Sequence, residues 1–161
     1  MVVLLMGVAG SGKTTIGLKL AAALGWGFRD ADEFHPPANI AKMSAGVPLD
    51  DRDRAPWLAA IRAHIAACLA RHENAVVTCS ALKEGYRLAV VADPTRVQLV
   101  HLAGDPGLIR QRLGGRQGHF MKPEMLQSQF EALEPPQGAL VVDVAPPPEA
   151  IVAQIRAALS L

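Results

Sequence analysis

The sequence predicts an α/β fold in which helices cover both faces of a five-stranded parallel sheet, forming a three-layer sandwich. Short segments rich in Val and Leu alternate with longer segments of helical periodicity. The apolar segments lack a strict polar alternation, so we expect both faces of each strand to be buried, as in parallel sheets. Alternation at this spacing also requires right-handed crossover connections. The expected strands are residues 2–6, 27–30, 75–79, 97–102 and 139–143.

The expected helices are recognised by their periodicity and their ends. In the segment 13–24 the apolar residues fall on one face, and Gly25 ends the helix. Asp50 is placed to cap a longer helix, with Asp53 in its first turn. The remaining helices are expected at residues 39–45, 81–92, 106–113, 124–133 and 148–159.

The composition indicates one domain, residues 1–161. Half of the residues are hydrophobic and 19% are charged, which is enough to bury a core and excludes a disordered chain. The 16 Lys and Arg balance 15 Asp and Glu, so nothing favours binding to nucleic acid or to an anionic membrane. Cys68 and Cys79 have no zinc-like or redox spacing. With neither a signal peptide nor a long apolar segment, we expect a cytoplasmic protein.

The strongest functional signal follows the first expected strand. The octapeptide Gly7-Val8-Ala9-Gly10-Ser11-Gly12-Lys13-Thr14 matches G-x-x-x-x-G-K-[ST] in full, between a buried strand and a helix. In such a loop, successive backbone N–H groups point at phosphate oxygens, and the helix N-terminus adds partial positive charge. We expect Lys13 to reach the β- and γ-phosphates and the Thr14 hydroxyl to ligate Mg²⁺. The expected nucleotide-binding residues of this segment are Gly7, Gly10, Ser11, Gly12, Lys13, Thr14 and Thr15.

Other features narrow the class of nucleotide protein. No N-K-x-D motif for guanine is present, which excludes an ordinary GTPase, and no G-x-G-x-x-G follows a strand, which disfavours a dinucleotide fold. A motor or a large ATPase needs a longer chain. A P-loop domain of this size therefore indicates a small-molecule phosphotransferase.

An acidic pair follows the second expected strand. The strand at residues 75–79 ends without an acid, whereas Asp30 and Asp32 lie at the end of the strand 27–30. Two residues apart in an extended segment, they are expected to point the same way. We assign Asp30 to the metal and Asp32 to the substrate hydroxyl, which it orients or deprotonates.

Basic residues after the third expected strand suit an anionic substrate. Lys83 and Arg87 are four residues apart on an expected helix and share a face. An Arg beside a Lys matches a carboxylate, at strand ends that open over the ligand crevice. Arg54 is expected to add to this pocket, and His35 and Lys42 are further candidates.

A glycine-rich basic stretch is predicted to form a lid over residues 113–124. Phosphoryl transfer requires positive charge over the γ-phosphate and exclusion of water, which a hinged basic loop can supply. We assign Arg116 to the transferring phosphoryl group and Arg112 to the nucleotide, and either could stack on adenine.

Taken together, these residues resemble gluconokinase of the small P-loop type, the thermoresistant-gluconokinase-like family, over essentially the whole chain. The P-loop alone is generic, whereas the His-Pro, Asn-Ile and Lys-Met blocks and the Cys-Ser-Ala-Leu-Lys block with its following Tyr-Arg are specific. Two departures are Pro37-Ala38, where the family often has a basic residue, and Ala31, where the family has Gly between the acids. The blocks that carry the resemblance are Gly7–Thr14, Asp30–Pro36, Asn39–Met43, Gly46–Leu58, Cys79–Arg87, Gly118–Phe120, Gln129–Leu133 and Val141–Asp143.

The resemblance implies ATP-dependent phosphorylation of D-gluconate at its 6-hydroxyl, giving 6-phospho-D-gluconate, with Mg²⁺. It also implies a fold like that of nucleoside monophosphate kinases and shikimate kinase, with a lid and often a homodimer. The residues themselves leave two alternatives open. One is a kinase for another small hydroxy acid such as shikimate, and the other is a non-catalytic nucleotide-binding module, which would need neither Asp32 nor a lid.

Overall fold

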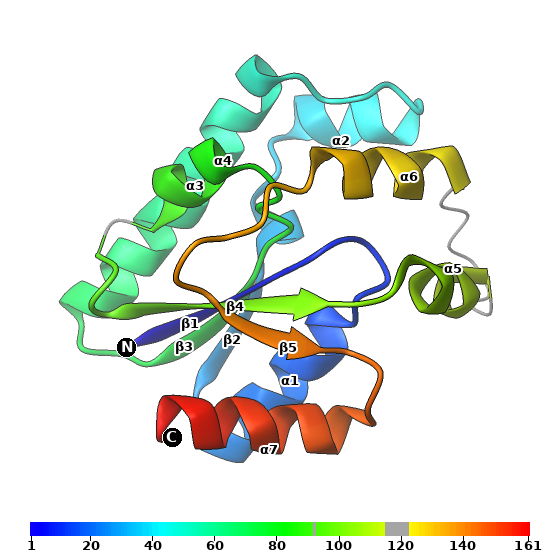
Figure 1. Cartoon of the computed structure of the whole chain (residues 1–161). Helices are drawn as coiled ribbons and strands as arrows, with labels where there is room; N and C mark the ends of the chain where they lie inside the picture. Colours follow the sequence, from blue (N-terminus) through cyan, green and yellow to red (C-terminus); the bar gives the residue numbers. More distant parts are fainter. Residues whose placement is uncertain (92, 115–122) are drawn as a thin grey trace.

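The computed structural model describes residues 1–91, 93–114 and 123–161. Five strands form one parallel sheet in the order β2-β3-β1-β4-β5, with β1 at its centre (Figure 1). The predicted α/β sandwich with five parallel strands is confirmed. The strands are β1 (Val2–Met6), β2 (Gly27–Asp30), β3 (Ala75–Thr78), β4 (Val97–Ala103) and β5 (Leu140–Asp143).

Helices flank the sheet on both faces (Figure 1). Helices α1 and α7 pack on one face, and α3 and α4 on the other. No helix of the described residues is long and apolar enough to cross a membrane. The helices are α1 (Lys13–Leu24), the 3₁₀ helix η1 (Ala31–Phe34), α2 (Pro37–Ser44), α3 (Asp51–Ala70), α4 (Glu84–Val90), α5 (Pro106–Gly114), α6 (Pro123–Ala132) and α7 (Pro148–Leu159).

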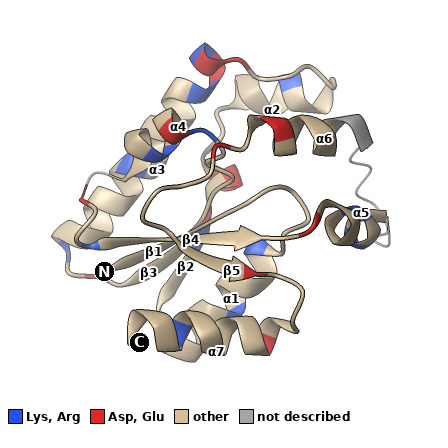
Figure 2. Ribbon diagram, viewed as in Figure 1, with Lys and Arg blue, Asp and Glu red and all other residues tan. Residues whose placement is uncertain are grey.

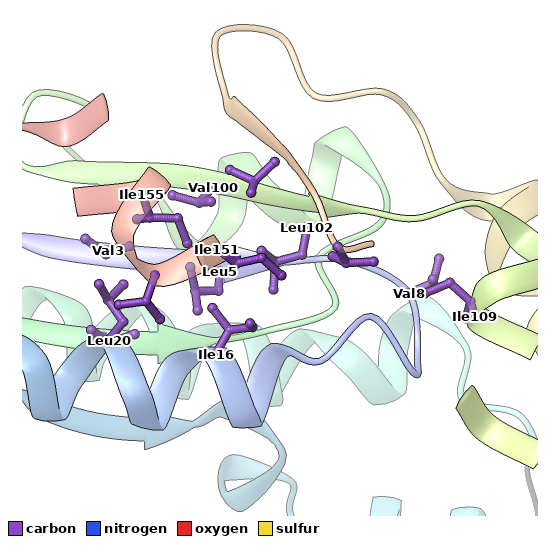
Figure 3. Packing of buried hydrophobic residues seen from close by; sticks show 14 of the residues in the cluster. Val3, Leu5, Val8, Ile16, Leu20, Val100, Leu102, Ile109, Ile151 and Ile155 are labelled. Carbon is purple, nitrogen blue, oxygen red and sulfur yellow. The ribbon is translucent and has the colours of Figure 1, made fainter. Parts of the chain in front are cut away.

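The three inner strands, β1, β3 and β4, contain no Asp, Glu, Lys or Arg, and the charged residues lie mostly on helices and loops (Figure 2). Consecutive side chains of β1 point to opposite faces of the sheet. Val3 and Leu5 pack against α1 and α7, whereas Leu4 packs against α3. Figure 3 shows the first of these clusters, with Ile16 of α1 and Ile151 of α7 against β1. Burial of each such side chain contributes about 1.5–3 kcal/mol, so the centre of the sheet is a rigid support for the loops at its ends.

Two helices begin two or more residues away from their predicted starts. Helix α2 begins at Pro37 instead of residue 39, because proline suits the first helical turn. Helix α4 was expected from residue 81 but begins at Glu84, since Ala81 has a left-handed backbone with φ of 43°. Lys83 is consequently the extended N-cap residue of α4 and lies outside the helix.

Candidate active site

The phosphate loop leaves β1 at the centre of the sheet. Its glycines adopt conformations that side chains disfavour, with φ of 79° at Gly10 and 89° at Gly12. A Cβ added at Gly10 would lie 2.7 Å from Leu113 Cγ, so the loop also has no room for a side chain there. The Lys13 ammonium donates to the carbonyl oxygens of Gly7 and Val8, at 3.0 Å each. The lysine therefore lies folded over the concave loop where phosphates are expected.

The loop has an unsatisfied polar group that fits a phosphate ligand. The Ser11 side chain is 1% exposed, and its hydroxyl has no hydrogen-bond partner in the described part of the chain. Buried hydroxyls normally have a partner, because leaving one unpaired costs about 1–3 kcal/mol. A phosphate ligand that hydrogen-bonds to the loop would supply the missing partner of the Ser11 hydroxyl.

The two predicted metal ligands lie side by side. The Thr14 hydroxyl donates to the Asp30 carboxylate at 2.9 Å. One hydroxyl and one carboxylate fit Mg²⁺, which takes few protein ligands and completes its shell with water and substrate phosphates. Among the described residues no group of three His, Cys, Asp or Glu is placed to hold a metal, so a site built from protein side chains alone is not found there.

Asp32 follows Asp30 in the 3₁₀ helix η1, so the extended segment predicted between the two acids is wrong. The other Asp30 oxygen accepts from the Asp32 backbone N–H at 3.2 Å, and a capping box with Glu33 fixes the turn. Asp32 reaches solvent, yet partial desolvation raises the pKa of its carboxyl, and the charge of Asp30 raises it further. Lys13 and His35 lower the pKa of Asp32 and so oppose that shift, which shows that both side chains lie close to this carboxyl.

His35 connects this acid to α3. Its ring stacks on Trp57, with centroids 4.5 Å apart and planes 9° apart, and Trp57 Nε1 donates to the Ala31 carbonyl at 2.7 Å. Burial is the main cause that lowers the pKa of His35, and the positive charge of Arg54 lowers it further. The imidazole is therefore held neutral above pH 6.5, between Asp32 and Arg54.

A cluster of charged and aromatic side chains continues from Arg54. The Arg54 guanidinium carbon lies 5.6 Å from the centre of the Tyr86 ring, and the Lys83 ammonium lies 5.5 Å from it. The Tyr86 hydroxyl donates to the Asp51 carboxylate, whose oxygen is 3.9 Å from Lys83 Nζ. The structure thus brings Asp32, His35, Arg54 and Lys83 into one continuous region. Tyr86 belongs to the Cys79–Arg87 block that carries the resemblance, but it was not predicted as a site residue.

Arg87 is placed differently from the other predicted bases. Its side chain is 6% exposed, and its Nη1 donates to the carbonyls of Ala81 at 3.1 Å and Leu82 at 2.9 Å. No carboxylate pairs with it among the side chains that the structure describes. Burial and the charge of Arg87 lower the pKa of the neighbouring His101. Within residues 1–91, 93–114 and 125–161, the buried Arg87 charge has no compensating acid, which is costly unless an anion binds beside it.

Of the remaining predicted bases, Lys42 and Arg112 contact other parts of the protein, and Arg116 is not described. Lys42 is engaged within the protein, where it pairs with Asp53 at 2.7 Å. Arg112 Nη2 donates to the Val144 carbonyl at 2.8 Å, which holds it at the end of β5. Arg116 and residues 115–122 of the predicted lid lie outside the described residues.

A phosphate loop, a hydroxyl–carboxylate pair and a second acid beside Lys13 define a P-loop kinase with a small-molecule acceptor. A family model described as shikimate kinase matches residues 9–135. The gluconokinase of Gluconobacter oxydans (strain 621H) is 47% identical over 131 residues, which are 81% of this chain and 74% of that protein. The thermoresistant gluconokinase of Escherichia coli (strain K12) is 41% identical, covering 92% of this chain and 87% of that protein.

The likeness extends to three dimensions. The crystal structure of a gluconokinase from Sinorhizobium meliloti 1021 superposes with a TM-score of 0.86 at 44% identity, covering 98% of this chain and 90% of the other. The chain belongs to the gluconokinase family, within the wider group that the shikimate kinase model describes. The resemblance inferred from the sequence blocks is confirmed.

Proposed function

We propose that this protein transfers the γ-phosphoryl group of ATP to the 6-hydroxyl of D-gluconate, giving 6-phospho-D-gluconate. The observation that carries the choice of a sugar acid is the Arg87 guanidinium, which is buried with no carboxylate partner in the described part of the chain. Membership of the gluconokinase family supports gluconate as that acid. Shikimate, the alternative acid, has less support, because the relatives with high identity over most of the chain are named gluconokinases.

At the phosphate end, backbone amides of the phosphate loop and the Lys13 ammonium bind the triphosphate. Thr14 and Asp30 would hold Mg²⁺, which when bound neutralises charge on the phosphate oxygens. Asp32 orients the 6-hydroxyl toward the phosphoryl group or accepts its proton. The raised pKa of Asp32 keeps the carboxyl a better proton acceptor than an ordinary aspartate.

At the acceptor end, Arg54, Lys83 and Arg87 supply positive charge for the carboxylate of gluconate, and neutral His35 can hydrogen-bond a sugar hydroxyl. Fixing the carboxylate far from the phosphates leaves the 6-hydroxyl in line for transfer, so positioning does much of the catalytic work. Arg112, Arg116 and a lid over residues 113–124 stay predictions for the nucleotide side, as do a homodimer and a cytoplasmic location.

A coupled assay of ADP release tests the proposal. The purified protein is given MgATP with D-gluconate, shikimate, other sugar acids and, as a control without a carboxylate, D-glucose. We expect turnover with gluconate to exceed all others, with the product carrying phosphate on the 6-oxygen by NMR. If turnover is highest with shikimate, shikimate and not gluconate is the substrate. If no acid is turned over, the result favours a non-catalytic nucleotide-binding module.

A further inference from the structure

Helix α6 and the residues directly after it contact both ends of the candidate site. Gln129 in α6 reaches the phosphate loop, and Glu134 reaches the loop that carries Lys83. Neither side chain has a role in the mechanism above. In Figure 1, α6 lies between α5 and α2 and leads into the chain that passes beside α4.

Gln129 holds one amide of the phosphate loop. The Ala9 backbone N–H donates to Gln129 Oε1 at 2.7 Å, between residues 120 positions apart in the sequence. Because an N–H group can only donate, the side-chain oxygen of Gln129 must face the loop. The helix that carries Gln129 is anchored by Leu126, which is 3% exposed in the hydrophobic core. The contact therefore joins the phosphate loop to a helix that is anchored in the core.

The adjacent residue of the loop is also held. A Cβ at Gly10 would lie 2.7 Å from Leu113 Cγ, so the last turn of α5 presses on the loop next to the Gln129 contact. Gly10 and Ala9 are thus fixed by two different helices. The conformation of the loop determines where its N–H groups point, so these contacts preset the geometry for phosphate.

Glu134 holds the other end of the site. Its Oε2 accepts from the Glu84 backbone N–H at 2.6 Å, and its own N–H donates to the Leu82 carbonyl at 3.0 Å. The same Leu82 carbonyl accepts from Arg87 Nη1 at 2.9 Å. Lys83 lies between the two contacts as the N-cap of α4. Glu134 therefore fixes the short segment that carries Lys83 and whose Leu82 carbonyl holds the Arg87 guanidinium.

We propose that Gln129 and Glu134 are positioning residues that act on opposite ends of the reaction, Gln129 on the nucleotide and Glu134 on the acceptor. The acceptor part rests on the proposed function. Loss of one such hydrogen bond is expected to change the affinity of its own substrate about three- to tenfold and to leave the other within about twofold. If α6 and the residues after it had only a structural role, each variant would change the affinities for nucleotide and for acceptor together.

Variants that keep side-chain size test the nucleotide end. Gln129→Met removes the acceptor, and the matched control Gln127→Met alters an exposed residue of α6 that pairs with Glu131. We expect the Kd of a Mg²⁺ complex of a non-hydrolysable ATP analogue, measured by calorimetry, to rise three- to tenfold only in Gln129→Met. The NMR shift of the Ala9 amide should also move in that variant alone. An unmoved Ala9 amide, or an equal effect in Gln127→Met, overturns the assignment.

The acceptor end is tested with Glu134→Ala and the conservative Glu134→Gln, whose amide oxygen can still accept from the Glu84 N–H. Glu134→Ala should raise the KM for gluconate three- to tenfold at an unchanged nucleotide Kd, and Glu134→Gln should restore it. Equal KM values in both variants, or a parallel loss of nucleotide affinity, contradict the proposal. Wild-type protein without gluconate turnover would refute the proposed function instead, while the nucleotide measurements on Gln129 would still decide its role.

Discussion

The Thr14 hydroxyl donates to the Asp30 carboxylate at 2.9 Å, joining the phosphate loop after β1 to the end of β2. Strand β3 lies between β1 and β2 in the sheet. The contact therefore joins two strand ends that are not neighbours, and it is made from the first turn of α1, the helix that connects β1 to β2. It places a hydroxyl and a carboxylate together beside the phosphate loop. This is the arrangement that a magnesium–nucleotide complex requires from its protein.

Asp30→Asn tests this pair. The substitution removes the charge for the metal but preserves a hydrogen-bond acceptor for Thr14. We expect the Mg²⁺ concentration for half-maximal turnover to rise about tenfold or more, the usual scale for a perturbed metal site. Binding of ATP without metal should change little. An unchanged Mg²⁺ requirement, measured by titration at fixed ATP, would exclude Asp30 as a ligand.

Arg87→Ala is expected to raise the KM for gluconate about 10- to 100-fold, because a buried charge-assisted hydrogen bond contributes about 1.5–3 kcal/mol. The KM for ATP should stay near the wild-type value. The substitution also frees the Ala81 and Leu82 carbonyls, so the free energy of unfolding should be measured in parallel. Arg87→Lys, which keeps the charge, should lose less affinity for gluconate. A wild-type KM in Arg87→Ala would mean that the carboxylate binds elsewhere.

Tyr86 separates two cations, and its ring and hydroxyl have different partners. Tyr86→Phe removes the hydrogen bond to Asp51 but keeps the ring beside Arg54 and Lys83. Tyr86→Leu removes the aromatic face, which contributes about 0.5–1 kcal/mol for each exposed cation. We expect the gluconate KM to rise about two- to fivefold in Tyr86→Leu and less in Tyr86→Phe. The same KM for both variants would show that the ring does not position the cations.

The ion pair of Lys42 and Asp53 makes stability depend on pH. The side-chain hydrogen bond from Lys42 is the largest cause that lowers the pKa of Asp53 below its ordinary 3.8. A lowered carboxyl pKa stabilises the folded chain above pH 3.8, and this contribution is lost as the pH falls through the folded-state pKa. Lys42→Met should therefore be less stable than wild type at pH 7, with a smaller difference at pH 3. Urea unfolding at both pH values measures this, and a difference independent of pH would contradict the pairing.

The sequence was most informative where local chemistry decides the structure. The bounds of α1, Lys13 to Leu24, were predicted correctly, because the P-loop fixes its start and Gly25 its end. The left-handed Ala81, which shortens α4, was not predictable, since nothing in its residue type favours that backbone. The turn at Asp32 was also missed, because a capping box between Asp30 and Glu33 overrides the extended conformation expected there.

The site was predictable as a set of residues but not in its internal connections. Asp32, His35, Arg54 and Lys83 were named from the sequence, and the structure brings them together. The backbone contacts of Arg87 depend on how the loop before α4 folds, and the contact from Gln129 to Ala9 spans 120 positions. Such contacts arise from tertiary packing, which single-sequence patterns do not contain.

The proposed mechanism depends above all on Asp32 as the group that orients or deprotonates the acceptor hydroxyl. Single-turnover phosphorylation of gluconate by Asp32→Asn is its most direct test, with Glu33→Gln, a neighbouring acid in η1, as the matched control. We predict a fall of at least about 10²-fold in the rate of Asp32→Asn, at a wild-type Kd for MgATP, and a near-wild-type rate for Glu33→Gln. A near-wild-type rate in Asp32→Asn would contradict this role.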